Sequence, residues 1–290
     1  MSHTPHPEME PILAMARAAP PPNLEAMPPA AGRAWFTETH VRMNQPLPPC
    51  SARDVTVGGV PCRLLNEAAG PGRIVYVHGG GWTFGNPATH ERSARLLALD
   101  ANLSVLLPDY RLAPEHPCPA AIEDVLALLA ALPSGPGVLT GDSAGANVAL
   151  AAAQSGARVD MLSLWYGCFA PIFDTLSHRE CGDGSFGLTT GRMRWYWTNW
   201  LGSVPSARGV PLEGPMAALP RTHLVAAGLD CLRDDTLLLA GRLASAGVPL
   251  RLDVLPGLVH GFLQLTALVR PAREAVTLIA DEIRQSLNRE

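Results

Sequence analysis

Short apolar segments alternate with longer amphipathic segments from Arg73 to the end of the chain. The apolar segments have the length of β-strands and lack the polar alternation of a half-exposed sheet, so we expect them to be buried on both faces. Because amphipathic segments of helical length separate them, the pattern predicts an α/β fold with a mostly parallel, doubly wound sheet flanked by helices. The expected strands are Ile74–Val77, Leu103–Leu107, Val138–Gly141, Met161–Tyr166, His223–Ala227 and Leu250–Leu255. The expected helices are Ala88–Asp100, Pro119–Leu132, Ala144–Gln154, Asp234–Gly247 and Pro271–Asn288.

Two stretches do not follow this alternation. Residues 1–50 are rich in proline and hold two helix-capable pieces, Ile12–Ala19 and Ala30–Met43, which indicates an arm rather than a core element. More than fifty residues separate the fourth expected strand from the fifth, which is too long for one crossover. We therefore expect an insertion over one edge of the sheet, at about residues 170–210.

The sequence also predicts a hairpin before the alternating region and a tryptophan-rich helix in the insertion. Residues 53–67 predict a β-hairpin that turns at two consecutive glycines. The insertion carries Trp195, Trp197 and Trp200 on an expected helix, and we expect these rings mainly to pack the insertion onto the sheet.

The segment Gly141–Gly145, with the sequence Gly-Asp-Ser-Ala-Gly, joins an expected strand to an expected helix. A serine at the apex of a sharp strand-to-helix turn is the nucleophile elbow of α/β-hydrolases. A pattern this short occurs by chance in roughly one chain in ten of this length. The meaning of Ser143 therefore depends on whether the chain supplies a base, an acid and an oxyanion hole nearby.

The candidate base is a histidine, and position along the chain selects one. In open α/β sheets the chemistry takes place outside the carboxyl ends of the strands. His260 follows the strand Leu250–Leu255 at that end, whereas His223 begins a strand and His178 lies in the insertion. We therefore predict that His260 is the base.

The same rule selects the acid. Asp230 follows the strand that ends at Ala227, at the carboxyl end of the sheet. Asp234 and Asp235 fall in the first turn of the next helix, where a carboxylate suits the helix dipole, and Asp253 lies within a strand. Asp142, beside the serine, is expected to fix the elbow by hydrogen bonds rather than to take part in attack.

Ser143, His260 and Asp230 together form a predicted catalytic triad in the order expected of an α/β-hydrolase. A serine hydroxyl is a poor nucleophile at neutral pH, so it needs a base that takes its proton during attack and later delivers it to the leaving group. The carboxylate would hold the histidine in the correct tautomer and stabilise the imidazolium.

The glycine run His78–Trp82, with the sequence His-Gly-Gly-Gly-Trp, follows the strand Ile74–Val77, again at the carboxyl end. Consecutive glycines let the backbone approach a substrate closely. We expect the N–H groups of Gly80, Gly81 and Ala144 to hold the developing oxyanion. The alternatives are a flexible turn or a phosphate loop, but the run has neither a lysine nor the spacing of a nucleotide-binding loop. Trp82 is expected to face the substrate.

Composition excludes several classes of protein. The chain has 290 residues, an apolar content of 47% and a net charge of −4 without a basic block, so it can form a large core and is not expected to bind nucleic acid or anionic membranes. Six cysteines form no C-x-x-C pair and no metal-ligand spacing, so we expect reduced thiols in a cytoplasmic protein, with no metal and no cofactor. The first residues predict neither a signal peptide nor a transmembrane segment.

Taken together, these motifs resemble the hormone-sensitive lipase family of α/β-hydrolases, and specifically its bacterial carboxylesterases with a Gly-Asp-Ser-Ala-Gly elbow. The resemblance rests on His78–Trp82, Asp109–Pro117, Gly141–Gly145, Asp230–Asp234 and His260–Phe262, which occur in the family's order. It implies an α/β-hydrolase catalytic domain over residues 51–290 and a helical cap to which both the N-terminal arm and the insertion contribute. By analogy with the family, the last strand and the last helix are candidate surfaces for a homodimer.

The sequence departs from the family at two places outside the predicted triad. Cys231 stands where the family usually has a proline after the acid, and Gly167-Cys168 replaces an apolar residue and a proline. Neither change removes a catalytic group, so we expect them to affect packing and the shape of the pocket.

The leading interpretation is a serine carboxylesterase that hydrolyses small, soluble esters of short- to medium-chain acids through a covalent acyl-enzyme. The preference for small esters rests on a compact cap and on the lack of a lipid-binding segment. Two alternatives stay open. The same residues would serve a deacetylase or amidase of a small acylated metabolite, and the fold could also serve as a non-catalytic small-molecule receptor, although the triad is complete here.

Overall fold

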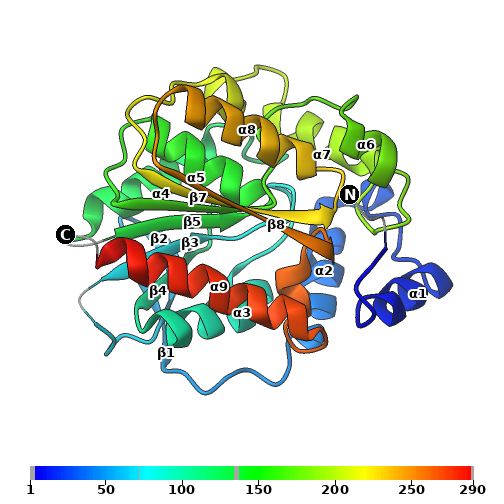
Figure 1. Cartoon of the computed structure of the whole chain (residues 1–290), viewed down its shortest axis with the longest axis horizontal. Coiled ribbons are helices and arrows are strands. Elements are labelled where there is room, and N and C mark those ends of the chain that lie inside the picture. Colours follow the sequence, from blue (N-terminus) through cyan, green and yellow to red (C-terminus); the bar gives the residue numbers. More distant parts are fainter. Residues whose placement is uncertain (1–3, 71, 134–136, 289–290) are drawn as a thin grey trace.

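The computed structural model describes residues 4–70, 72–133 and 137–288. Its strands are β1 (Ala52–Val57), β2 (Val60–Leu65), β3 (Arg73–Val77), β4 (Ser104–Pro108), β5 (Gly137–Asp142), β6 (Met161–Trp165), β7 (Arg221–Leu229) and β8 (Leu250–Val259). They form one sheet in the order β1-β2-β4-β3-β5-β6-β7-β8 (Figure 1). β1 pairs antiparallel with β2, as does β2 with β4, and the remaining pairs are parallel. The predicted hairpin corresponds to β1 and β2.

Helices cover both faces of the sheet. They are α1 (Glu10–Ala18), α2 (Pro29–Met43), α3 (Pro87–Ala101), α4 (Ala120–Ala131), α5 (Ala144–Gln154), α6 (Leu176–Cys181), α7 (Thr190–Leu201), α8 (Arg233–Ser245) and α9 (Arg270–Leu287). α3 and α9 lie on one face, and α4, α5 and α8 lie on the other (Figure 1). The first face buries side chains such as Leu97 and Ile279, and the second buries Val125, Val148 and Leu239. The predicted fold class, a doubly wound and mostly parallel α/β sheet, is confirmed.

β8 extends further than predicted. We expected the strand to end at Leu255 and a loop to follow, but after a register shift the pairing with β7 resumes between Leu229 and Val259. Gly257 has a φ of +74°, which suits an irregularity of this kind. As a result, His260 directly follows a strand instead of standing in a loop.

The arm and the insertion lie at the same end of the sheet. The arm contains α1, α2 and the short helix η1 (Leu24–Ala26), and the segment between β6 and β7 contains α6, α7 and the short helices η2 (Ala207–Gly209) and η3 (Pro211–Glu213). Figure 1 shows α2, α6 and α7 at the end toward which the arrow of β7 points. The helix predicted to carry Trp195, Trp197 and Trp200 is α7. None of the described helices is long and apolar enough to cross a membrane.

Candidate active site

Ser143 stands at a strained turn between β5 and α5. Its φ of +53° and ψ of −121° belong to a region that residues other than glycine rarely adopt. The Ser143 N–H donates to the carbonyl of Trp165, 2.9 Å away, which fixes the turn on β6. A β-carbon at Gly145 would lie 2.1 Å from the carbonyl oxygen of Val77, so a glycine is required where the elbow meets β3. The local sequence therefore forms the elbow that its pattern predicted.

The structure brings the three predicted triad residues together. The Oγ of Ser143 lies 2.9 Å from the Nε2 of His260, and the Nδ1 of His260 lies 2.7 Å from the Oδ2 of Asp230. The side chain of Asp230 is fully buried, whereas that of His260 is 15% exposed. A buried carboxylate that accepts from Nδ1–H leaves the lone pair of Nε2 for the serine proton.

Backbone and ring contacts hold Asp230 and His260 in place. The second oxygen of Asp230 accepts a hydrogen bond from the Leu232 N–H at 2.9 Å, so both oxygens of the carboxylate have a donor. The ring of Tyr166, just after β6, meets the imidazole of His260 edge-on with 5.1 Å between centroids, and Phe262 packs against Tyr166 in turn. The imidazole therefore keeps one orientation toward Ser143.

Gly80 and Gly81 form the glycine loop that faces the serine. Their φ angles are +119° and +61°, and both residues line the cavity at Ser143. Within the described residues, neither of their backbone N–H groups donates a hydrogen bond to another backbone group. Ala144 is the first residue of α5, so no carbonyl within the helix accepts a hydrogen bond from its N–H. Three backbone donors are thus free near the nucleophile, at the positions predicted for the oxyanion hole.

Asp142 links this glycine loop to the elbow. Its Oδ1 accepts from the Gly79 N–H at 2.9 Å and from the Tyr76 hydroxyl at 3.1 Å, and its Oδ2 accepts from the Tyr166 hydroxyl at 3.2 Å. The Nε2 of His90 lies 3.4 Å from Oδ1. Burial opposes ionisation of this carboxyl, but His90 and the surrounding donors hold the pKa of Asp142 below its ordinary value. The structure agrees with the expected bracing role of Asp142, which extends to the glycine loop.

Trp82 lies away from the cavity, in contrast to our expectation. Its side chain is fully buried, stacks on Trp200 with 5.0 Å between ring centroids, and meets Trp197 edge-on at 4.8 Å. Trp82 is not among the described residues that line the cavity at Ser143. The structure therefore corrects the prediction that Trp82 contacts substrate: the ring packs helix α7 against the loop that follows β3.

The cavity at Ser143 has a volume of about 330 Å³. One wall comes from the arm and the other from α7 and the residues before it. Besides Ser143, His260 and the glycine loop, the lining includes Pro21, Phe36, His40, Met43, His90, Asp142, Gly187, Leu188, Thr189, Arg192, Met193, Tyr196, Gly261, Gln264 and Leu265. This volume is at the low end of the range for small-molecule sites, which is roughly 300–1,000 Å³.

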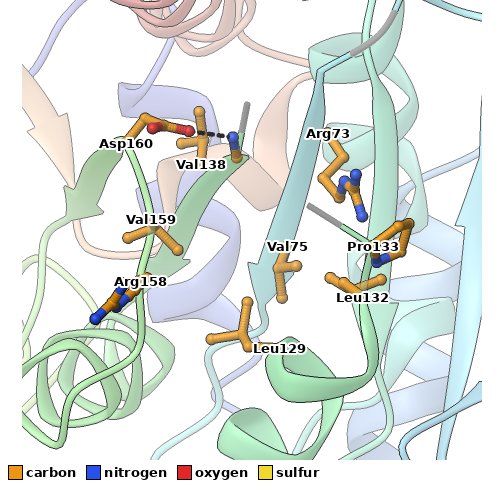
Figure 2. Close-up of a pocket in the computed structure, with 10 residues that line it drawn as sticks. Arg73, Val75, Leu129, Leu132, Pro133, Val138, Arg158, Val159 and Asp160 are labelled. Atoms are coloured by element: carbon orange, nitrogen blue, oxygen red, sulfur yellow. Dashed lines mark hydrogen bonds between the residues drawn. The ribbon is translucent and has the colours of Figure 1, made fainter. Parts of the chain in front are cut away.

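A second cavity of about 350 Å³ lies at the opposite end of the sheet. Figure 2 shows it between the amino ends of β3 and β5, with Arg73 and Leu132 on one side and Arg158 on the other. Asp160 accepts a hydrogen bond from the backbone of Gly137 there, at 2.6 Å. None of the predicted site residues lines this cavity. Among the described residues, no group of three or more His, Cys, Asp or Glu side chains could hold a metal ion.

Two histidines near the site, the buried His78 and the half-buried His40, are uncharged at neutral pH. Burial lowers the pKa of His40 to about 4 and that of His78 to about 3. Each Nδ1 donates to a nearby carbonyl, that of Phe36 for His40 and that of Gly79 for His78. In the unfolded chain a histidine takes up its proton near pH 6.5. Between pH 6.5 and 4 the unfolded state therefore binds more protons, and acidification destabilises the fold.

We expect the free energy of unfolding to fall as the pH is lowered from 7 to 5. In His40→Phe this fall should be smaller by on the order of 1–2 kcal/mol, because the variant lacks a histidine that takes up a proton in the unfolded state but stays neutral in the fold. Urea titrations at both pH values measure the difference. An equal fall in wild type and His40→Phe would contradict the burial argument.

The fold and the site agree with comparisons to known proteins. A family model described as the α/β hydrolase fold matches residues 74–264. The chain belongs to the α/β-hydrolase family. Its resemblance to the hormone-sensitive lipase, or carboxylesterase, group of that family is also confirmed, because its relatives are carboxylesterases.

Two relatives come from Mycobacterium tuberculosis. The carboxylic ester hydrolase LipN is 33% identical over 259 residues, which cover 80% of this chain and 68% of LipN. The carboxylesterase NlhH is 34% identical over 223 residues, which cover 70% of each chain. These relatives confirm the prediction that this α/β-hydrolase is an enzyme of the carboxylic ester hydrolase type.

Two solved structures resemble the whole molecule. A hyperthermophilic esterase from the archaeon Pyrobaculum calidifontis matches with a TM-score of 0.88 and 27% identity, over 97% of this chain and 98% of that chain. The ester hydrolase EH1AB1 from the metagenome of Lake Arreo, complexed with a derivative of bipyridine phosphonate, matches with the same TM-score and identity, over 97% and 99%. The likeness extends across the arm and the insertion of this hydrolase as well as its sheet.

Sequence reasoning missed several side chains around the triad of this hydrolase. Tyr166 directly follows β6, so the carboxyl-end rule that selected Asp230 could have identified it as well. His40 on α2 and Arg192 on α7 line the cavity from the arm and the insertion. No local pattern marks them, because only the tertiary packing brings their helices to the site.

Proposed function

We propose that the protein is a serine carboxylesterase that hydrolyses esters of short- to medium-chain acids through a covalent acyl-enzyme. The observation that carries this proposal is the continuous hydrogen-bonded chain from Ser143 through His260 to Asp230, beside a loop whose backbone donors are free. That arrangement provides a nucleophile, a base and an oxyanion hole within one cavity.

In the first half of the reaction, the Oγ of Ser143 attacks the ester carbonyl while His260 takes its proton through Nε2. The carbonyl oxygen gains negative charge, which the N–H groups of Gly80, Gly81 and Ala144 stabilise. The imidazolium is stabilised by the carboxylate of Asp230. When the tetrahedral intermediate collapses, His260 gives its proton to the leaving alcohol, and the acyl group stays on Ser143.

In the second half, a water molecule attacks the acyl-enzyme. His260 removes a proton from this water, the same backbone donors hold the second oxyanion, and the proton passes to Ser143 as the acid leaves. Each carboxylic ester is thus converted to one acid and one alcohol with one water consumed.

The preference for short and medium chains is supported by the size and walls of the cavity. At about 330 Å³ it has room for a small ester, and residues of the arm and of α7 close it on two sides. We propose that the arm, over residues 1–50, and the insertion, at about 170–210, together act as the cap of a catalytic domain that spans residues 51–290. Phe36, Met43 and Met193 give the cavity apolar walls for an acyl chain.

A chain-length series tests this preference. With 4-nitrophenyl esters of linear acids, we expect kcat/KM to be highest for acids of about four to eight carbons and to fall steeply for longer chains, because the cavity cannot enclose them. Initial rates below the solubility limit of each ester measure the series, and the matching anilides measure amide cleavage. A maximum at long-chain, insoluble esters would contradict the proposed substrate size, and faster cleavage of the anilides would favour the amidase alternative.

A cytoplasmic location and a homodimer stay predictions. The outer edge of β8 has no partner strand within the described residues, which supports pairing with a second copy of the chain. The expected ligand is a small-molecule ester, and the proposed reaction uses no metal or cofactor.

A further inference from the structure

Arg192 is the one permanently charged cation among the described residues that line the cavity at Ser143. It lies in the first turn of α7, where a positive charge is unfavourable to the helix dipole, and that turn contains no acidic residue. Residues that break a local rule in this way are expected at functional sites. The position of Arg192 therefore calls for an explanation beyond helix stability.

The guanidinium of Arg192 is only partly used by the protein. Its Nε donates to the Oε1 of Glu25, 2.9 Å away, and the Arg192 side chain is 23% exposed. Within the described residues neither terminal nitrogen pairs with a carboxylate, and the guanidinium lies beside the hydroxyl of Tyr196, whose ionised form it favours. Glu25 thus binds the Nε side of the guanidinium, and no carboxylate among the described residues occupies the fork of two terminal nitrogens. Such a fork matches the two oxygens of a carboxylate.

Arg192 lines the same cavity as the glycine loop, one helical turn from a residue that contacts that loop. It precedes Tyr196 by one helical turn on α7, and both side chains line the cavity. The ring of Tyr196 contacts the glycine loop so closely that a β-carbon at Gly81 would lie 2.2 Å from a ring carbon. One turn corresponds to about 5 Å along the helix axis, which is the length of a short chain of methylene groups.

The ion pair with Glu25 is not needed to hold the arm in place. The neighbouring Leu24 is 3% exposed and belongs to the main hydrophobic core. On α2, Arg33 donates to the carbonyls of Thr83 and Ala113 and pairs with Glu115. The contacts of Leu24 and Arg33 anchor the arm without the ion pair, so the pair between Arg192 and Glu25 is free to serve the substrate.

We infer that Arg192 is a specificity-determining residue that binds a carboxylate on the substrate, so that the preferred esters are monoesters that carry a second, ionised acid group. Glu25 orients the guanidinium from the opposite side. This inference rests on the proposed esterase function and narrows it to a substrate class. The carboxylate can lie on the acyl or on the alcohol side of the ester, and the test separates the two.

Two pairs of esters of matched shape provide the test. Monoethyl glutarate is compared with ethyl 5-methylhexanoate, in which an isopropyl group replaces the carboxylate on the acyl side. The butanoate ester of 4-hydroxybutanoic acid is compared with that of 4-methylpentan-1-ol, which makes the same change on the alcohol side. Acid release is followed by pH-stat titration, and the quantity compared is the ratio of kcat/KM for the charged ester to that for its neutral match.

In Arg192→Met we expect this ratio to fall roughly ten- to hundredfold for at least one pair, the range for loss of hydrogen bonds to a charged group. The matched control is Arg194→Met, because Arg194 lies in the same helix but packs over the ring of Phe173, 4.3 Å from its centroid, and does not line the cavity. It should keep the wild-type ratio. Glu25→Gln should raise the ratio, since a competing carboxylate is removed while the arm stays anchored.

An unchanged ratio for both ester pairs in Arg192→Met would overturn the inference. If the charged and neutral esters also lose activity equally in Glu25→Gln, the ion pair only fastens the arm. Absence of hydrolysis of all four esters by the wild-type enzyme would instead contradict the proposed function, so the two failures are distinguishable.

Discussion

Replacement of Ser143 by alanine is expected to lower kcat about a millionfold, the loss seen when a triad nucleophile is removed. Within the described part of the chain, the Oγ of Ser143 hydrogen-bonds His260 and no other group, so the variant loses the nucleophile and little else. Alanine accepts the positive φ at this position no worse than serine does, and the backbone bond to Trp165 remains. The fold should therefore survive the change.

Hydrolysis of 4-nitrophenyl butanoate, corrected for the spontaneous rate, measures this effect. The matched control is Ser155→Ala at the C-terminal end of the same helix, where the hydroxyl only bonds a helix carbonyl, and it should keep wild-type activity. Circular dichroism and the melting temperature establish that both variants are folded. Residual activity of Ser143→Ala at a hundredth of the wild-type rate, in a preparation free of wild-type enzyme, would be incompatible with the proposed mechanism.

The second largest effect is expected at Asp230. In Asp230→Asn the side chain keeps its shape, and its oxygen can still accept from the Leu232 N–H. The amide NH₂ then faces His260 Nδ1, which favours the tautomer with its proton on Nε2. That tautomer cannot take the proton of Ser143. We expect kcat to fall about ten-thousandfold with little change in KM, since the substrate pocket is untouched.

Steady-state kinetics with the butanoate ester measure both parameters. Asp234→Asn is the matched control, because Asp234 lies in the next helix and accepts from the Ser177 N–H without contact to the triad. It should change kcat little. If Asp230→Asn lost less than about tenfold in kcat, Asp230 would not orient the base and another acid would have to be sought.

The sequence predicted the sheet and the reacting groups because both depend on local patterns. Buried strands and crossover helices have characteristic lengths and periods, and these were sufficient for the doubly wound fold. Ser143, Asp230 and His260 each directly follow the last residue of a strand, at Asp142, Leu229 and Val259. One topological rule therefore placed all three at the carboxyl end of the sheet.

The environment of Trp82 could not be predicted in the same way. Adjacency to the glycine loop suggested contact with substrate, but the ring stacks on Trp200, a partner far away in the sequence. Nothing in the residues around Trp82 encodes that partner. The direction of a side chain at a tight turn is decided by the tertiary contacts available to it, here the aromatic face of α7.

The walls of the cavity were unpredictable for a related reason. His40 lies in the arm before β1, and Arg192 lies in the insertion between β6 and β7. Only the packing of the arm and α7 at one end of the sheet brings the two side chains to one cavity. The pairing of Arg192 with Glu25 likewise joins the insertion to the arm. The positions of the predicted reacting groups thus follow from topology, whereas the residues that line the cavity follow from how the arm and α7 pack.

Covalent labelling tests the central claim, that Ser143 is the nucleophile of an acyl-transfer site, most directly. A fluorophosphonate reacts with an activated serine, and intact-mass analysis counts the adducts on the protein. We expect one adduct on the wild-type enzyme, mapped to Ser143 by peptide analysis, and none on Ser143→Ala under the same conditions. A wild-type enzyme that takes no label, or equal labelling of Ser143→Ala, would contradict the account.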